Sequence, residues 1–486
     1  MDFLTDGRGY SVGAALVVVV IMLAQWRVIL SASLIGVFCT GTLVFTIVGL
    51  LLMPWMRPYL PTWFPRLQLE AIGGQDYLYA DLLMVGGLAL VLMAYQASHA
   101  LAHHGRLCRT GPRLTALMRT SRVDFSLPAL LVATLAALAA SVALMLQYRS
   151  QIEVGLVEGF LGANPLAMFV ARREVGENYA LFQLVQNVLP YYAVAMWLVW
   201  RVTGHRPIRG AALVACTAAA VMLVFLFQKR PLLVFLLMLG LLSAWGPSWR
   251  RALERRRRSV RPRASAVRVV LFGSLLFALL CVLYFFSTTV VRGAPGGLVG
   301  AVGTLGQIAL TRVVGRLALP VPMYTHVFPG IHEHYGLSNV GLLGRLWGAE
   351  FFPDTFYVFS VFSNSGISGS AAVPALGDFY GQFGFTGWFV GACLLGVALQ
   401  WGDSVLVRVR DRPSGVLLIM AAMIFAYYLT QANLPRALLG YGGVVFLAQW
   451  LLLAPACLRR TWRRTRPVAQ TGVASAAEGA TPASRR

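Results

Sequence analysis

The chain has 486 residues, and 58% of them are hydrophobic while only 12% are charged. A soluble domain is about 45–50% apolar and about 25% charged, so this composition excludes an ordinary soluble protein and indicates a membrane protein. The formal net charge of +23 is also typical of proteins that bind nucleic acids. However, no nucleic-acid recognition motif accompanies the arginines. We therefore expect no nucleic-acid partner and assign the basic excess to orientation and to anionic lipid headgroups.

Apolar runs long enough to cross a bilayer recur along the chain. A hydrocarbon core about 30 Å thick needs roughly 20 apolar residues in a helix. Spanning backbone must satisfy its own hydrogen bonds, which favours helices over open strands. We therefore predict an all-α polytopic membrane protein with about 11 transmembrane helices, within a range of about 10–13. The expected spans are 10–26, 28–53, 78–100, 126–148, 179–200, 210–228, 231–247, 267–289, 379–400, 415–433 and 438–457.

The distribution of basic residues predicts how these spans are oriented. Short cytoplasmic loops carry an excess of Lys and Arg, and the densest basic stretch is 250–263. The segments expected in the cytoplasm are Arg27, 101–125, 201–209, 248–268, 401–414 and the tail from Leu458. We therefore predict a multi-pass protein of the bacterial cytoplasmic (inner) membrane, with the N-terminus outside and the C-terminus in the cytoplasm.

These spans and their connections divide the chain into four regions. A transmembrane bundle at 1–289 precedes a large outer loop at 290–378, C-terminal transmembrane helices at 379–457 and a basic, disordered cytoplasmic tail at 458–486. The outer loop is rich in Phe, Tyr, Leu and Gly and low in net charge, which argues against disorder. Because structureless connections longer than about 12–15 residues are uncommon, we expect this loop to be folded and to carry the functional site.

Some arginines lie where orientation does not explain them. Lys229 and Arg230 separate two apolar runs at a junction predicted to face outside. There Arg230 either extends to the lipid headgroups or faces a water-filled cavity and binds an anion. Arg312 and Arg316 are four residues apart, so a helix would put them on one face. They are either surface residues of an interfacial helix or a clamp for pyrophosphate, whose oxygens suit the planar guanidinium group.

Three histidines lie close together in the outer loop: His326, His332 and His334. Histidine titrates near neutral pH and can act as a general base toward a hydroxyl group. The alternative is a structural role in which the rings are hydrogen-bonded. Their spacing matches no standard zinc motif, so we expect no metal ion. The neighbouring Tyr324 and Tyr335 offer aromatic faces suited to stacking on sugar rings.

Motifs of several enzyme classes do not occur in the sequence. There is no GxxxxGK[ST] phosphate-binding loop, which excludes an ATP-driven pump of that type. Neither HExxH nor GxSxG occurs. Because the predicted cytoplasmic loops are short and arginine-rich, we expect the substrate to arrive from the membrane plane or from outside, and we expect no cofactor.

The motifs of the outer loop together resemble a known family. The segments TRVVGRLALP (311–320), PMYTHVFP (322–329) and HYGLS are similar to the outer loop of the oligosaccharide repeat-unit polymerases called Wzy, the O-antigen polymerase family. The segment GDFYGQFGFTG (377–387) is similar to the one with which those polymerases enter the next helix. The junction QKRPLLVFLLMLGLL is similar to an arginine motif shared with the related O-antigen ligases, with Pro231 in place of a glycine.

The resemblance implies an inverting glycosyltransferase of the GT-C-like membrane class. Its donor would be a glycan on undecaprenyl pyrophosphate, and its acceptor would be the non-reducing end of another lipid-linked repeat unit. No nucleotide and no metal would be needed. The residues assigned to the pyrophosphate are Arg230, Arg292, Arg312 and Arg316. The candidate bases are His326, His332, His334 and Asp378, and the candidate glycan-contacting residues are Tyr324, Tyr335 and Tyr380.

The sequence thus predicts a polymerase that joins lipid-linked repeat units into O-antigen, capsule or exopolysaccharide on the outer face of the cytoplasmic membrane. An O-antigen ligase shares the leaving group and is the alternative within the same enzyme class. A lipid-linked glycan flippase is the alternative from another class, and it would favour repeated halves with broken helices. The expected partners are the lipid-linked glycan and the bilayer, and the family adds a chain-length regulator and a flippase.

Overall fold

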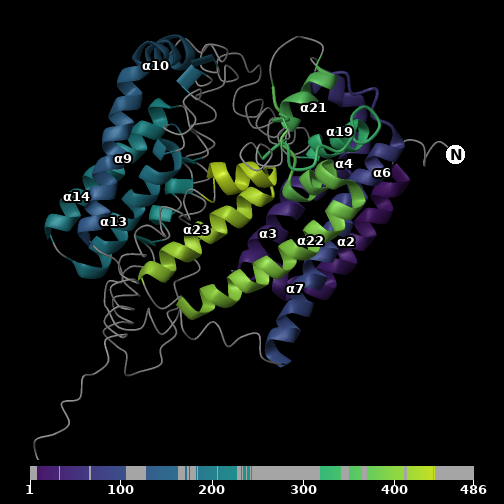
Figure 1. Ribbon diagram of the computed structural model, residues 1–486, viewed down its shortest axis with the longest axis horizontal. Coiled ribbons are helices and arrows are strands. Elements are labelled where there is room, and N and C mark those ends of the chain that lie inside the picture. The colour runs from purple at the N-terminus through teal and green to yellow at the C-terminus, as the bar shows by residue number, and fades with distance from the viewer. Residues whose placement is uncertain are drawn as a thin grey trace, which may run out of the picture.

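The computed structural model describes residues 8–104, 127–161, 184–226, 318–340, 350–363, 369–409 and 413–441 except at 32, 65–66 and 205, together with isolated positions within 170–182 and 231–243 and at 348 and 443. Helices make up most of this part of the chain (Figure 1). The only extended pairing among the described residues is an isolated bridge between Leu67 and Ser363. The described part of the chain is therefore mainly helical, with non-helical stretches such as 328–340 and 369–374.

The helices form two groups along the chain, with π-helical turns continuing several of them. The first group contains α2 (Arg8–Ile29), α3 (Leu34–Thr42), η1 (Leu43–Ile47), α4 (Val48–Met56), α6 (Gly74–Asp81), η3 (Leu82–Gly86) and α7 (Gly87–His104). The second contains α9 (Leu127–Gln147), α10 (Arg149–Val154), η6 (Leu184–Val188), α13 (Leu189–Thr203) and α14 (Arg206–Phe225). The C-terminal elements are α19 (Pro320–Val327), α21 (Asp354–Phe362), α22 (Ala375–Val409), α23 (Pro413–Leu429) and η8 (Arg436–Tyr441).

Six described helical stretches are long and apolar enough to cross a membrane. They are Arg8–Ile29, Leu34–Tyr59, Gly74–Ala102, Leu127–Gln147, Arg206–Phe225 and Ala375–Leu406, and a shorter apolar helix covers Gly415–Leu429. Each of the seven overlaps a span expected from the sequence, which confirms a helical membrane protein. The total of about eleven spans stays a prediction, because 267–289 and most of 438–457 lie outside the described residues.

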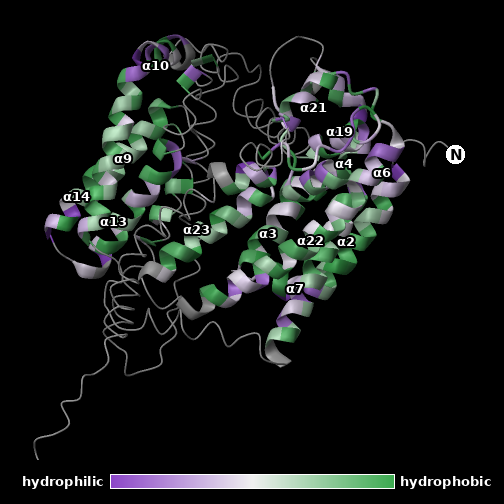
Figure 2. Ribbon diagram, viewed as in Figure 1, coloured by the Kyte–Doolittle hydropathy of each residue, from purple (hydrophilic) through white to green (hydrophobic). Residues whose placement is uncertain are grey.

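Buried apolar side chains form two clusters, which we call the first and second bodies. The first body joins α2, α3, α4, α6, α7, α19, α21 and α22, and the second joins α9, α10, α13 and α14. Helix α23 links them, because Leu417 and Ala421 belong to the second cluster while Ala426 and Leu429 belong to the first. Apolar residues also cover the helix surfaces (Figure 2), as expected where hydrocarbon replaces water.

The first body has two polar ends. At one end lie the start of α6, the helices α19 and α21, and the start of α22 (Figure 1); we call this the site end. At the opposite end, Asp403 of α22 accepts hydrogen bonds from the backbone N–H groups of Leu34 (2.7 Å) and Ile35 (3.4 Å) at the start of α3. Tyr95 of α7 donates to the same carboxylate at 3.2 Å. This carboxylate therefore caps a helix whose first N–H groups have no partner within the helix itself.

Candidate functional site

Asp378, in the first turn of α22, is fully buried at the site end. Its Oδ1 atom accepts hydrogen bonds from the Tyr335 hydroxyl at 2.7 Å and from Asn339 Nδ2 at 3.1 Å. Its Oδ2 atom accepts from Gln382 Nε2 at 3.2 Å and from the backbone N–H of Leu434 at 3.0 Å. Four donors thus surround the carboxylate, which is the arrangement expected of a buried charge that holds a structure together.

Asp354, the first residue of α21, forms a second buried carboxylate site. Its Oδ2 atom accepts hydrogen bonds from the Tyr324 hydroxyl at 2.7 Å and from Asn433 Nδ2 at 3.1 Å. Nearby, Arg436 donates to Thr355 Oγ1 at 2.9 Å. Burial raises the pKa of Asp354, while the hydrogen bonds from Tyr324 and Asn433 and the charge of Arg436 act in the opposite direction.

Residues 433–436 join the two carboxylates into one network. Asn433 donates its side-chain N–H to Asp354, and the next residue, Leu434, donates its backbone N–H to Asp378. The network therefore ties α21, α22 and the segment after α23 together with the loop 318–340. We call these two carboxylates and their donors the acid network.

The three tyrosines expected to contact the glycan are buried. Tyr324, Tyr335 and Tyr380 are only 0%, 7% and 3% exposed. The first two donate to Asp354 and Asp378, and Tyr380 donates to the carbonyl oxygen of Phe328 at 2.8 Å. Burial raises the pKa of both Tyr324 and Tyr335 well above its usual value. Their faces are covered because their hydroxyls are needed as donors inside the network, so the structure gives them a structural role.

His326 and Asp76 form a pair that is partly exposed to solvent. His326 Nδ1 lies 3.0 Å from Asp76 Oδ2, and the two side chains are 25% and 15% exposed. The same oxygen accepts a hydrogen bond from the backbone N–H of Gly73 at 2.8 Å, and Thr325 Oγ1 donates to the Asp76 carbonyl at 2.9 Å. With Nδ1–H directed at a carboxylate, Nε2 is the imidazole nitrogen that can accept a proton.

The local sequence explains how this pair is held. Helix α19 begins with Pro320, whose fixed φ suits a first helical turn. Asp76 lies in the first turn of α6, where a negative charge interacts favourably with the helix dipole. Because α19 packs against α6, His326 in the last turn of α19 meets Asp76 in the first turn of α6.

The other two candidate histidines have different surroundings. His332 Nδ1 lies 2.6 Å from the carbonyl oxygen of the adjacent Glu333, and its ring stacks on Phe352 with a centroid distance of 4.6 Å. His334 Nδ1 lies 3.3 Å from the carbonyl oxygen of Gly381. Within the described part of the chain, His326 is therefore the one candidate histidine with a carboxylate partner.

Helix α22 is interrupted close to these histidines. Phe383 and Gly384 have non-helical backbone angles, and Gly384 has a φ of 67°, a conformation that glycine adopts most readily. The loop fills the break, because Tyr335 N–H and Gly336 N–H donate to the carbonyl oxygens of Gly381 (3.3 Å) and Gln382 (2.9 Å). The loop and the start of this span are thus one hydrogen-bonded unit.

All four arginines expected to bind pyrophosphate, namely Arg230, Arg292, Arg312 and Arg316, lie outside the described residues. The described guanidinium groups at the site end are those of Arg436, Arg57 and Arg8, and Arg8 lies over the ring of Trp55 at 5.1 Å. Arg57 donates to the carbonyl oxygen of Ile72 at 3.3 Å. In the part of the chain that the structure describes, three or more His, Cys, Asp or Glu side chains nowhere group as metal ligands.

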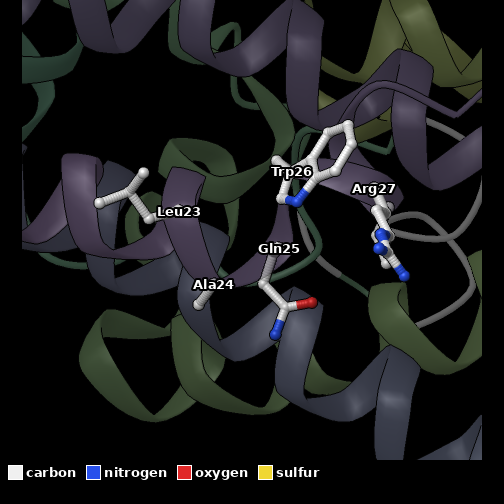
Figure 3. Close-up of a pocket in the computed structure, with 6 residues that line it drawn as sticks. Leu23, Ala24, Gln25, Trp26 and Arg27 are labelled. Atoms are coloured by element: carbon white, nitrogen blue, oxygen red, sulfur yellow. The ribbon is translucent and has the colours of Figure 1, made fainter.

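A surface hollow of about 390 Å³ lies on helix α2 (Figure 3). It includes Arg27, at the end of α2 opposite the site. Six consecutive residues of α2, 23–28, line it. Gln25 in this stretch forms a hydrogen bond with Gln96 of α7. Because the whole lining comes from one helix, the hollow is a surface feature of α2, and it lies apart from the acid network and the His326–Asp76 pair.

The sequence alone did not single out Asp76, Asn433 or Arg436. A signal for Asp76 was visible, since GGQDY places two glycines and an acidic residue directly before an apolar run, as at the start of a helix. Its pairing with His326, 250 positions further along the chain, could not be read from local pattern.

Comparison with known proteins found no matching family model, no matching curated protein and no matching solved structure. The function is therefore argued from the site and from the motifs of the sequence.

Proposed function

We propose that the protein is a membrane glycosyltransferase that polymerises undecaprenyl-pyrophosphate-linked oligosaccharide repeat units. The observation that carries the proposal is the His326–Asp76 pair, a part-exposed imidazole held by a carboxylate at one end of a membrane-type helical bundle. A substrate with a lipid tail and a polar glycan would place its reactive centre at such an end. The resemblance of the loop motifs to Wzy polymerases supports the choice of substrate.

In this proposal the site end lies on the outer face of the cytoplasmic membrane. Helix α2 has an arginine at each end, Arg8 near the site end and Arg27 on the opposite side, so the orientation is supported by the other spans. Helices α7 and α22 lead from the site end toward two of the basic segments expected in the cytoplasm, 101–125 and 401–414. Positive charge concentrated at one end is the usual mark of the cytoplasmic side.

The reaction is a displacement at the anomeric carbon of the donor glycan. Nε2 of His326 takes the proton from the acceptor hydroxyl as that oxygen bonds to C1, and the C1–O bond to undecaprenyl pyrophosphate breaks. Asp76 stabilises the imidazolium that forms, and attack from the opposite side inverts the anomeric centre. A positioned general base contributes about 10²–10⁴-fold to a rate.

The leaving pyrophosphate requires cations, and the proposed ones are Arg230, Arg292, Arg312 and Arg316. Preorganised donors directed at a developing negative charge are worth about 2.7–4 kcal/mol each when one is removed. Asp378 does not share the base role in this mechanism, because both of its oxygens already accept hydrogen bonds inside the acid network.

The proposal is tested in a strain that lacks the gene and carries a plasmid copy. Wild-type protein is expected to restore long polymer, whereas His326→Ala at matched protein level is expected to leave single lipid-linked repeat units. His332→Ala serves as the matched control, because its ring contacts aromatic side chains and the Glu333 carbonyl oxygen but no described carboxylate, and it is expected to retain polymer. Full-length polymer from His326→Ala would contradict the proposed site.

The same strain separates the proposed class from its alternatives. Loss of the gene is expected to give repeat units on the outer leaflet without polymer. Polymer that is made but remains unattached to lipid A core would instead indicate a ligase.

A flippase is the second candidate, and the interruption of α22 at Phe383 and Gly384 favours it. Broken helices inside membrane spans form the substrate and ion sites of many transporters. Repeat units accumulating on the inner leaflet of the deletion strain would support this candidate and reject the polymerase.

A further inference from the structure

The first three membrane spans, Arg8–Ile29, Leu34–Tyr59 and Gly74–Ala102, contain buried polar atoms that have no hydrogen-bond partner within the described part of the chain. They are Arg8 Nε, whose guanidinium group lies over the ring of Trp55, and four side-chain oxygens, namely Thr42 Oγ1, Thr46 Oγ1, Tyr77 Oη and Asp81 Oδ2. The four residues that carry these oxygens are 1%, 0%, 2% and 5% exposed. Buried polar atoms are nearly always paired, so several unpaired ones in one region require an explanation.

Two of these side chains share one side of α6. Tyr77 and Asp81 are four residues apart on the helix, which places them on the same face. Ser11 of α2 forms a hydrogen bond with Asp81, so this face of α6 is turned toward α2. The Oδ2 atom of Asp81 is left without a donor, whereas Asp76, the other acidic residue of α6, is paired with His326.

The other two side chains lie on the second span. Thr42 ends α3 and Thr46 lies in η1, again four residues apart, and both are turned away from the exposed side of the helix, where Val44 and Val48 are 48% and 44% exposed. The π-helical turn η1 contacts the π-helical turn η3, which begins directly after Asp81. The unpaired oxygens therefore lie on helices that contact one another, and π-helical turns within α-helices frequently mark functional sites.

The charge of the region indicates what would occupy it. Hard cations are bound by carboxylate and hydroxyl oxygens, and intramembrane carboxylates are costly unless they are paired. A single carboxylate is neutralised by a monovalent cation, whereas a divalent cation would leave a net positive charge in a medium of low dielectric constant.

We propose that Asp81, together with Ser11, Thr42 and Thr46, forms a binding site for a monovalent alkali cation between the first three spans. Tyr77 is not part of it, because the charges that act on its hydroxyl are those of Arg57 and Asp76. The site is separate from the proposed catalytic pair, although both use α6: Asp76 lies in its first turn and Asp81 is its last residue. Occupancy would neutralise Asp81 and supply the missing partner for the threonine hydroxyl oxygens.

The experiment is binding of radioactive sodium to purified full-length protein in lipid nanodiscs, with choline as the counter-cation. Saturable binding that unlabelled sodium or potassium displaces is expected for the wild type, and Asp81→Asn is expected to abolish it. Thr46→Val is expected to weaken it by roughly tenfold or more, as loss of groups around a metal ion generally does. Glu70→Gln, which changes an exposed acidic residue, is the matched control and is expected to bind as the wild type does.

Absence of saturable sodium binding in the wild type would overturn the proposal. Binding that survives in Asp81→Asn would also overturn it. Should Asp81→Asn fail to fold, the two variants Thr42→Val and Thr46→Val decide the question, because unchanged affinity in both would reject the site.

Discussion

The site end holds two acidic regions with opposite properties. In the acid network, Asp354 and Asp378 are 4% and 0% exposed, and each accepts hydrogen bonds from several donors. In the His326–Asp76 pair, the side chains are partly exposed and the imidazole keeps one nitrogen for a proton. The comparison indicates that the most buried acids build the architecture, while the proposed chemistry belongs to the less buried pair beside them.

This difference also explains how the loop is fixed on the bundle. The network joins residues far apart in the sequence, because Asp378 accepts hydrogen bonds from both Asn339 and Leu434. The position of α19, and with it His326, depends on that connection, since Tyr324 of α19 donates to Asp354. Network variants are therefore expected to lose stability, and pair variants are expected to lose activity alone.

Replacement of Asp378 by alanine is expected to cause the largest loss of stability. Its four donors would be left buried without an acceptor, and each such donor costs about 1–3 kcal/mol, so the folded state is expected to lose at least about 3 kcal/mol. Thermal unfolding of the purified protein and its level in membranes measure this. The exposed acid Glu350 provides the control, since Glu350→Ala is expected to change stability by no more than about 0.5 kcal/mol. An unchanged Tm for Asp378→Ala would show that the network is not structural.

Replacement of Asp76 by asparagine is expected to separate activity from stability. Asparagine keeps the size of the side chain but removes the charge that holds and stabilises the imidazolium, so polymer formation is expected to fall by about 10²-fold or more. The Tm is expected to stay close to that of the wild type. Glu333→Gln, an exposed change in the histidine segment, controls for the loss of a negative charge. Wild-type polymer from Asp76→Asn would remove the carboxylate from the mechanism.

Replacement of Arg436 by glutamine is expected to have a smaller effect on stability. The change removes the hydrogen bond to Thr355 and the positive charge near Asp354, and such losses cost about 1–3 kcal/mol. Unfolding in a denaturant gives the difference. The Arg436→Lys variant keeps the charge, so its stability is expected to lie between that of Arg436→Gln and that of the wild type. If lysine and glutamine were equally destabilising, the charge would have no part in the effect.

The pH dependence of stability is expected to show the smallest effect. Because burial raises the pKa of Asp354, its folded state binds a proton more tightly than its unfolded state. Its contribution to stability is therefore complete below the ordinary carboxyl pKa of about 4 and is lost as pH rises through the raised value. The Tm of the wild type, measured relative to Asp354→Asn, is expected to fall as pH rises. A relative Tm that rises with pH would contradict the sign.

The spans were predictable because their physics is local. A run of apolar residues such as 127–147 reveals a membrane helix without knowledge of its neighbours. The acid network and the His326–Asp76 pair depend on contacts between distant segments, which no local pattern encodes. The tyrosines show this limit. In the sequence, an aromatic residue beside a histidine suggests a surface for stacking on a sugar ring. In the structure, Tyr324 is buried and donates a hydrogen bond to Asp354.

The central claim is tested most directly by reconstitution. Purified wild-type protein and His326→Ala, matched in folded amount and placed in liposomes, are supplied with a lipid-linked repeat unit, and the rate of polymer formation is measured. The account predicts a loss of about 10²–10⁴-fold for His326→Ala with an unchanged Tm. Polymer formed by His326→Ala at the wild-type rate would contradict it.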